Sequence, residues 1–162
     1  MRRLLALATA LGLLMALSLS TSAFAGDQRP MAGHFTVAVV PVEQRCGPNA
    51  LTIGFEGTGN ATHLGRMTGT GSNCTELSLG TGAVAIWGGT ATFVAADGSS
   101  VTVTYEGAQE APVAGAATAI TENTVVSGTG RFAGADGSWT TTGTIDFTTG
   151  FFTGAFDGWI GF

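Results

Sequence analysis

The chain of 162 residues contains no lysine, and only 10% of its residues are charged. Its six arginines stand against eleven acidic residues, and two of those arginines, Arg2 and Arg3, lie at the very start. A chain with so few cations offers no basic patch that could neutralise the phosphates of nucleic acid. An anionic membrane surface is disfavoured for the same reason. We therefore expect no nucleic acid as a partner, and a membrane is a disfavoured one.

Long hydrophobic runs are also scarce, because the sequence has only one, from residue 4 to residue 19. It follows Arg2 and Arg3 and leads to "STSAFA", which ends at Ala25. The run is shorter than the roughly 20 residues that a membrane-spanning helix needs. A basic start, a short apolar run and a small-x-small ending are typical of a secretory signal peptide. We expect residues 1–25 to be that peptide, residues 26–162 to form one domain, and the protein to be secreted or periplasmic.

Only two cysteines are present, Cys46 and Cys74, and they lack the C-x-x-C spacing of a redox pair. In an exported protein, two isolated cysteines favour a structural disulfide over a metal site. In the chain-entropy model, closing a loop of this length stabilises the fold by about 3–4 kcal/mol. We predict a Cys46–Cys74 disulfide.

Residues for catalysis or metal binding are few. The two histidines, His34 and His63, do not form an H-x-H or H-x-x-x-H metal-binding pair. The G-x-S-x-G motif of a serine nucleophile does not occur. Metal binding needs clustered ligands, and nucleophilic catalysis needs a serine or cysteine beside a base. The sequence predicts no metal, no cofactor and no identifiable catalytic residue.

The sequence is rich instead in glycine, with 26 residues, and in threonine, and its apolar residues alternate with polar ones. From Trp139 to Phe147, for example, apolar residues and threonines take turns. Period-two alternation predicts strands, and no stretch after residue 26 has the 3.6-residue spacing of a helix. The expected strands cover residues 33–42, 50–58, 61–71, 83–95, 100–107, 116–126, 138–147 and 151–161.

Turn signals separate these segments. Asp97-Gly98, Asp136-Gly137 and the "TTG" at 148–150 each suit a hairpin, and only 107–119 has room for a helical turn. Short, evenly spaced strands joined by tight turns indicate an all-β antiparallel barrel of about eight strands or, alternatively, a β-sandwich. A closed barrel is favoured, because closure removes the sheet edges that a chain without lysine cannot protect with lysine.

Glycines also occur inside the expected strands, at Gly54, Gly65, Gly69, Gly143 and Gly154. Glycine weakens a strand, so such positions usually mark a bend, a bulge or the close approach of another group. A strongly coiled barrel needs bends, whereas an interior lined by small residues leaves room for a ligand. The sequence does not separate these two uses.

The stretch "SGTGRFAGADGSW" at 127–139 contains the G-x-G-x-x-G spacing of a dinucleotide-binding turn, at Gly128, Gly130 and Gly134. That fingerprint requires a helix after the glycines, to receive the pyrophosphate. The residues after Gly134 have the pattern of a turn and a strand. The glycines therefore indicate bends in a sheet and not a nucleotide site.

The same stretch resembles the G-(S/T)-G-x-F-x-G-x-x-G segment of the allene oxide cyclase and dirigent proteins, which share an eight-stranded antiparallel barrel. The matching positions are Gly128, Thr129, Gly130, Phe132, Gly134 and Gly137. "ATHLGRMTGTGSNC" and "GTGRFAGADGSWTTTGTIDF" are also similar to a group of small exported bacterial proteins without an assigned function. The resemblance implies an exported barrel that is open at one end to a small apolar molecule, and it leaves a homo-oligomer open. Within the motif we expect the glycines to allow bends, Phe132 to plug the barrel and Arg131 to pair with a carboxylate.

Four side chains are candidates for contact with a ligand. Glu56 and Glu106 each follow an aromatic residue at the end of an alternating run, where both can approach a barrel mouth. His63 lies in "THLG", and Arg66 lies among threonines and glycines. Each also has a purely structural interpretation: a solvated strand end for the glutamates, a hydrogen-bonded bend for His63, and an ion pair for Arg66.

The function favoured by these observations is binding of a small apolar or amphipathic molecule inside an exported barrel. Three alternatives stay open: a surface or interaction protein with a packed barrel, an isomerase-like or cyclase-like enzyme, and a small outer-membrane barrel. The last is suggested by the terminal strand, which ends at Phe162 as outer-membrane strands often end in phenylalanine.

Overall fold

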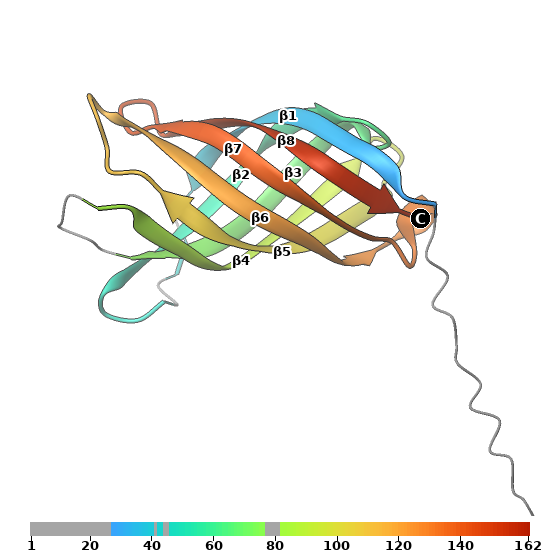
Figure 1. Cartoon of the computed structure of the whole chain (residues 1–162), viewed down its shortest axis with the longest axis horizontal. Helices are drawn as coiled ribbons and strands as arrows, with labels where there is room; N and C mark the ends of the chain where they lie inside the picture. Colours follow the sequence, from blue (N-terminus) through green and yellow to red (C-terminus); the bar gives the residue numbers. More distant parts are fainter. Residues whose placement is uncertain (1–26, 41, 44–45, 77–81) are drawn as a thin grey trace, which may run out of the picture.

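The computed structural model describes residues 27–40, 42–43, 46–76 and 82–162. The expected signal peptide therefore lies outside the described residues. Eight strands follow one another along the chain (Figure 1). They are β1 (Arg29–Val40), β2 (Ala50–Ala61), β3 (Gly65–Glu76), β4 (Val84–Ala95), β5 (Ser100–Gln109), β6 (Ala116–Gly128), β7 (Asp136–Asp146) and β8 (Phe151–Gly161).

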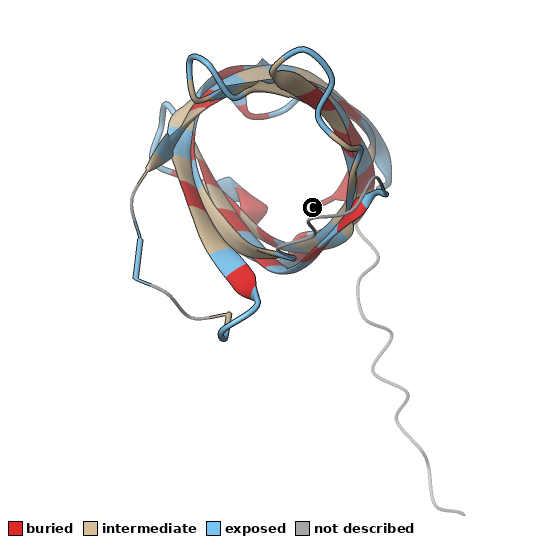
Figure 2. Cartoon of the chain, turned by 90° about the vertical axis from the view of Figure 1, so that its left-hand side faces the viewer, coloured by how far each residue is buried: buried red, intermediate tan, exposed pale blue. Residues whose placement is uncertain are grey.

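Each strand pairs antiparallel with the next, and β8 returns to pair with β1, so the sheet closes on itself. Seen from one end, the strands form a ring (Figure 2). In the closing pair, Phe35 of β1 lies opposite Gly154 of β8. The expected closed antiparallel barrel of eight strands is confirmed, and the alternative of a β-sandwich is wrong.

Three details differ from the sequence expectation. The third strand begins at Gly65 and not at residue 61, because residues 62–64 form the turn after β2. Asp136 and Gly137 lie inside β7 and do not form a hairpin turn. The segment after β5 contains a Val113–Ala116 bridge around Ala114 at φ 53°, and no helix.

The described residues contain one short helix, the 3₁₀ turn η1 (Gly130–Phe132), between β6 and β7. It reverses the chain at the place where Asp136-Gly137 was expected to do so. No helix in the described ranges is long and apolar enough to cross a membrane.

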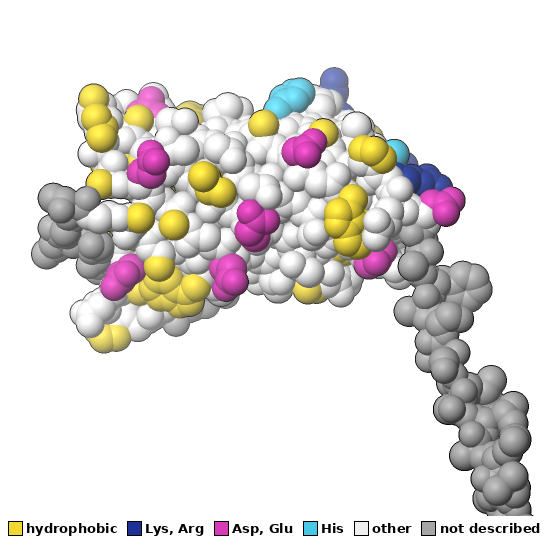
Figure 3. Space-filling model, in the orientation of Figure 1, with side chains coloured by type: hydrophobic (Ala, Val, Ile, Leu, Met, Phe, Trp, Pro, Cys, Tyr) yellow, Lys and Arg dark blue, Asp and Glu magenta, His cyan; other side chains and the backbone are white. Residues whose placement is uncertain are grey.

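The strand alternation separates an apolar interior from a polar exterior. In β5, Val101 and Val103 are fully buried, whereas Thr104 and Glu106 are exposed. In Figure 3, backbone and uncharged side chains without a colour of their own cover most of the visible outer wall, and separate acidic and apolar side chains are scattered among them. A membrane barrel has the opposite arrangement, with an apolar band facing lipid and a polar lumen. The outward residues therefore do not support the outer-membrane alternative.

Cys46 and Cys74 form the expected disulfide, with their Cα atoms 5.6 Å apart. Cys74 lies on the outer side of β3 beside a break in the register with β4, where Cys74 pairs with Trp87. The bond ties the segment before β2 to the end of β3.

Candidate functional site

One end of the barrel is packed solid. Phe132 from η1 is fully buried there, and its ring meets that of Phe162 edge-on, with centroids 5.0 Å apart. Met31, Leu64 and Ile160 complete this plug, and each is at most 2% exposed. The end at which the chain finishes is therefore closed by side chains, and Phe132 lies where the sequence motif placed it.

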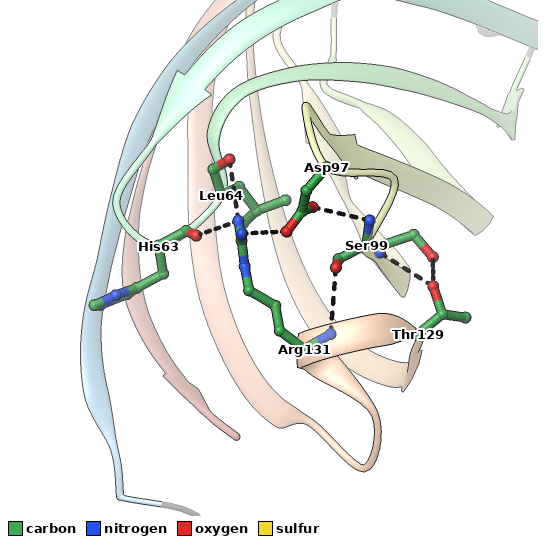
Figure 4. Close-up of polar contacts among 7 residues, drawn as sticks. His63, Leu64, Asp97, Ser99, Thr129 and Arg131 are labelled. Atoms are coloured by element: carbon green, nitrogen blue, oxygen red, sulfur yellow. Dashed lines mark hydrogen bonds and ion pairs between the residues drawn. The ribbon is translucent and has the colours of Figure 1, made fainter.

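Arg131 holds the loops of the plugged end together (Figure 4). Its guanidinium forms an ion pair with Asp97 in the β4–β5 turn and donates to the carbonyl oxygen of His63 in the β2–β3 turn at 2.9 Å. Its backbone N–H donates to Ser99 Oγ at 3.2 Å. Three turns far apart in the sequence thus meet on one side chain. This role is structural, and it is the carboxylate pairing expected for Arg131.

The other half of the interior is hollow. A cavity of about 320 Å³ opens at the end where β1 finishes and β2 begins. Its walls are predominantly apolar and come from all eight strands, and Phe35, Phe55, Phe93 and Phe152 are among the lining residues. Ligand pockets in proteins are commonly apolar hollows of this size with a few polar groups.

Interior glycines explain why the aromatic side chains leave this space open. A Cβ atom placed on Gly89 of β4 would lie 2.5 Å from the ring of Tyr105, its partner on β5. A Cβ on Gly71 of β3 would lie 2.5 Å from the ring of Phe55, its partner on β2. Each ring therefore lies against the wall, over the bare backbone of a neighbouring strand, and does not extend toward the barrel axis.

Three of the five glycines noted in the sequence behave in the same way, whereas Gly54 lies against Val40 and Val42, and Gly65 follows the β2–β3 turn with φ 67°. Rings of residues that line the cavity cover them: Phe93 over Gly69, Phe152 over Gly143, and Phe35 over Gly154. Aromatic rings that line the cavity thus pack directly against the backbone of these interior glycines.

The mouth of the cavity has an apolar rim. Leu51 and Phe147 line the cavity there and are 43% and 47% exposed. Glu76, at the end of β3, is the one charged residue among the described lining residues. The entrance thus admits apolar molecules, and no described cation lies in the wall to bind an anion.

Polar side chains form a patch on part of the cavity wall. The Tyr105 hydroxyl donates to Asn73 Oδ1 at 3.1 Å, and Asn73 Nδ2 donates to Thr75 Oγ1 at 2.8 Å. The Tyr105 ring reaches Asn73 on β3 because it crosses β4 at Gly89. The Tyr105 phenol is neutral at physiological pH, and burial raises its pKa above its ordinary value, so it stays neutral to higher pH.

Asn123 of β6 lies beside this pair, opposite Tyr105 in the β5–β6 register. It is 6% exposed and lines the cavity together with Thr121 and Thr141. Its Nδ2 lies 3.1 Å from Thr141 Oγ1, 3.3 Å from Thr121 Oγ1, and 3.2 Å from the carbonyl oxygen of Trp139. We define the polar patch as Asn73, Tyr105, Thr121, Asn123 and Thr141.

The four ligand candidates from the sequence lie elsewhere. Glu56, Arg66 and Glu106 are exposed residues of β2, β3 and β5, and none of them lines the cavity. His63 is exposed in a turn at the plugged end, with φ 66° and Nε2 3.1 Å from the carbonyl oxygen of Pro30. The interpretation that Glu56 and Glu106 approach the mouth is not supported, and His63 lies in a turn and is hydrogen-bonded, as in its structural interpretation.

The polar patch was not found from the sequence. A partial signal existed for Tyr105, because it shares the alternation of Val101 and Val103, which marks it as inward. The same alternation marks Glu106 as outward. Asn123 lies among threonines that do not reveal which face is buried.

A second hollow lies on the outside of β3 and β4 and measures about 460 Å³. Small residues such as Thr70, Ser72, Thr90 and Thr92 form it, and no charged or aromatic side chain is among the residues that line it. It is a surface trough without groups that fix a ligand. Across the described residues, no cluster of histidine, cysteine or acidic side chains is suited to a metal ion.

Comparison with known proteins gives limited matches. No family profile matches the sequence, and no curated protein matches it. The chain is similar to two solved structures, of the pterocarpan synthase dirigent proteins GePTS1 and PsPTS1, with 16% sequence identity to each. The alignment with GePTS1 covers 82% of this chain and 88% of the other, with a TM-score of 0.48. The alignment with PsPTS1 covers 85% and 97%, with a TM-score of 0.46. We assign the fold from the strand pairing itself.

Proposed function

We propose that this protein binds a small, predominantly apolar molecule inside the open half of the barrel. The observation that carries the proposal is the cavity of about 320 Å³, lined by aromatic and aliphatic side chains, in a barrel whose other half is fully packed. A barrel that serves only as a scaffold gains stability by filling its interior, because each buried methylene contributes about 0.8 kcal/mol. A barrel with an empty half lacks this stabilisation, which is expected when the space is kept for a ligand.

The charges around the cavity support a binding role over catalysis. Catalytic acids and bases lie beside the substrate with pKa values tuned to the reaction. The titratable side chains among the lining residues are Glu76 at the rim and Tyr105, whose phenol is kept neutral by burial. These two groups do not form an acid–base pair, and we propose binding without chemical conversion.

A fluorescence titration tests this function. N-phenyl-1-naphthylamine is a neutral apolar dye that brightens in apolar surroundings, and we expect the purified protein to bind it saturably with one site. Ala119 of β6 is 7% exposed and lines the cavity, so Ala119→Phe should fill the space and abolish the signal. Ala155 of β8 is exposed on the outer wall, so Ala155→Phe is the matched control and should bind as the wild type does.

Two results would contradict the proposal. One is the absence of saturable binding by a folded wild-type protein. The other is equal loss of binding in both variants, since that would place the dye outside the barrel. Circular dichroism of each variant establishes that the barrel is intact.

A further inference from the structure

The hydrogen bonds of Asn123 leave one of its atoms open to the cavity. Its Nδ2 carries two hydrogens and faces four acceptors, two of which are the carbonyl oxygens of Thr121 and Trp139. Carbonyl oxygens cannot donate, so they fix the amide with its nitrogen toward them. The oxygen Oδ1 therefore points away from these acceptors.

Within the described part of the chain, no hydrogen bond reaches Asn123 Oδ1. No fully buried side-chain nitrogen or oxygen among the described residues is without a partner. The oxygen is therefore not fully buried, and since Asn123 lines the cavity, we place Oδ1 at the cavity surface. An acceptor in a largely apolar space stabilises a ligand that donates a hydrogen bond to it and disfavours one that leaves it unpaired.

Two donors lie beside this acceptor. The hydroxyl oxygens of Thr121 and Thr141 accept from Asn123 Nδ2, and neither hydroxyl donates to any other described residue. Both can therefore donate to an atom in the cavity. The patch thus offers an acceptor and two donors within a few ångströms, and all of these groups are neutral. By contrast, the amide of Asn73 already accepts from Tyr105 and donates to Thr75.

A hydroxyl group is the simplest group that matches this arrangement, because it donates through its hydrogen and accepts through its oxygen. An ether or a ketone satisfies the threonines and leaves Asn123 Oδ1 unpaired. A carboxylate brings a negative charge to a wall with no described cation, which is costly without a partner. An ammonium group would also be desolvated there, and no acidic side chain belongs to the polar patch.

We infer that the ligand is an uncharged apolar molecule with a hydroxyl group, and that Asn123 with Thr121 and Thr141 selects it by exchanging hydrogen bonds with that hydroxyl. This inference rests on the proposed function, because it assigns a chemical class to the molecule in the same cavity. The apolar walls accept any apolar molecule that fits and therefore provide little specificity. The inference assigns the specificity of the cavity to the polar side chains of Asn123, Thr121 and Thr141.

Competition against the bound dye tests the inference with four compounds that share one ring system: naphthalene, 2-methoxynaphthalene, 2-naphthol and 2-naphthoate. We expect 2-naphthol to compete best, 2-methoxynaphthalene about fivefold less well because one hydrogen bond is lost, and 2-naphthoate not at all at neutral pH. Equal competition by 2-methoxynaphthalene and 2-naphthol, or tight binding of 2-naphthoate, overturns the inference.

Variants identify the side chains responsible. Asn123→Leu should lower the preference for 2-naphthol over naphthalene about fivefold, because 2-naphthol loses the acceptor for its hydroxyl hydrogen. Because Asn123 is buried and this variant risks misfolding, Thr141→Val provides a second test with nearly the same shape and should also lower the preference. Thr142 is exposed on the outer face of the same strand, so Thr142→Val is the matched control and should leave it unchanged.

The two proposals fail in different ways. If the dye does not bind the folded wild type saturably, the proposed function is wrong. If naphthalene binds and Thr141→Val leaves the preference for 2-naphthol unchanged, the hydroxyl inference is wrong and binding by the cavity stands. A hydroxyl effect that appears equally in Thr142→Val also overturns it.

Discussion

Replacing Ala119 by leucine should stabilise the protein, although a larger residue inside a barrel normally destabilises it. Ala119 is 7% exposed and faces the cavity between Gly143 of β7 and Gln109 of β5. Leucine adds three carbon atoms, and each buried methylene contributes about 0.8 kcal/mol. Because the space is open at the mouth, only part of this gain is realised, and we expect the free energy of unfolding to rise by about 1–2 kcal/mol.

Ala95 provides the matched comparison in the packed half. It is 4% exposed and belongs to the core cluster that contains Phe132 and Trp139. Ala95→Leu forces the same extra volume into a filled space, which typically costs about 1–3 kcal/mol. Urea unfolding of both variants measures the two changes under identical conditions. The reasoning is refuted if the two variants change stability in the same direction, because the cavity would then not differ from the core.

Three further predictions concern the walls and the covalent link. Tyr105 is the single tyrosine of the chain, so tyrosinate absorbance reports on it alone. Because its pKa is raised in the folded state, the contribution of Tyr105 to stability should be fully present below its unfolded pKa of 10.0 and be lost as the pH rises above it, whereas titration near pH 10 without unfolding would contradict this. Reducing the Cys46–Cys74 bond should lower the free energy of unfolding by about 3–4 kcal/mol, measured by denaturation with and without reductant, and an unchanged value would refute a stabilising role. Gly89→Ala should displace the Tyr105 ring and cost about 1–3 kcal/mol in thermal or urea unfolding. A Cβ on Gly82 would meet no atom within 4 Å, so Gly82→Ala should cost far less. Equal effects of the two variants would contradict the inference that Gly89 makes room for the Tyr105 ring.

The fold could be predicted from the sequence because closed barrels repeat one simple pattern. Inward and outward residues alternate without interruption along β5 and β7, and turn residues mark most of the ends. The failures were local. Asp136-Gly137 has the composition of a hairpin turn, but the chain has already reversed at η1, and both residues pair with β8.

The site was harder to predict than the fold, for a physical reason. Chemical reactivity drew attention to Glu56 and Glu106, whereas the alternation that places Phe55 and Tyr105 inside places their charged neighbours outside. The cavity itself depends on which ring covers which glycine across a strand pair, as with Phe55 and Gly71. That information is contained in the register between strands, and a single strand's pattern does not reveal it.

Because side chains plug one end, the barrel encloses a cavity that is open at one end only and not a channel through the protein. Phe132 and Phe162 close the far side, so a bound molecule has to leave by the mouth through which it entered. Transport through the protein along its axis is therefore ruled out by this packing. A ligand bound in this cavity would have one end exposed to solvent at the mouth, where another molecule can reach it, and its opposite end buried. If the cavity binds a ligand as proposed, that ligand has to pass the rim residues Leu51 and Phe147 both on entry and on release.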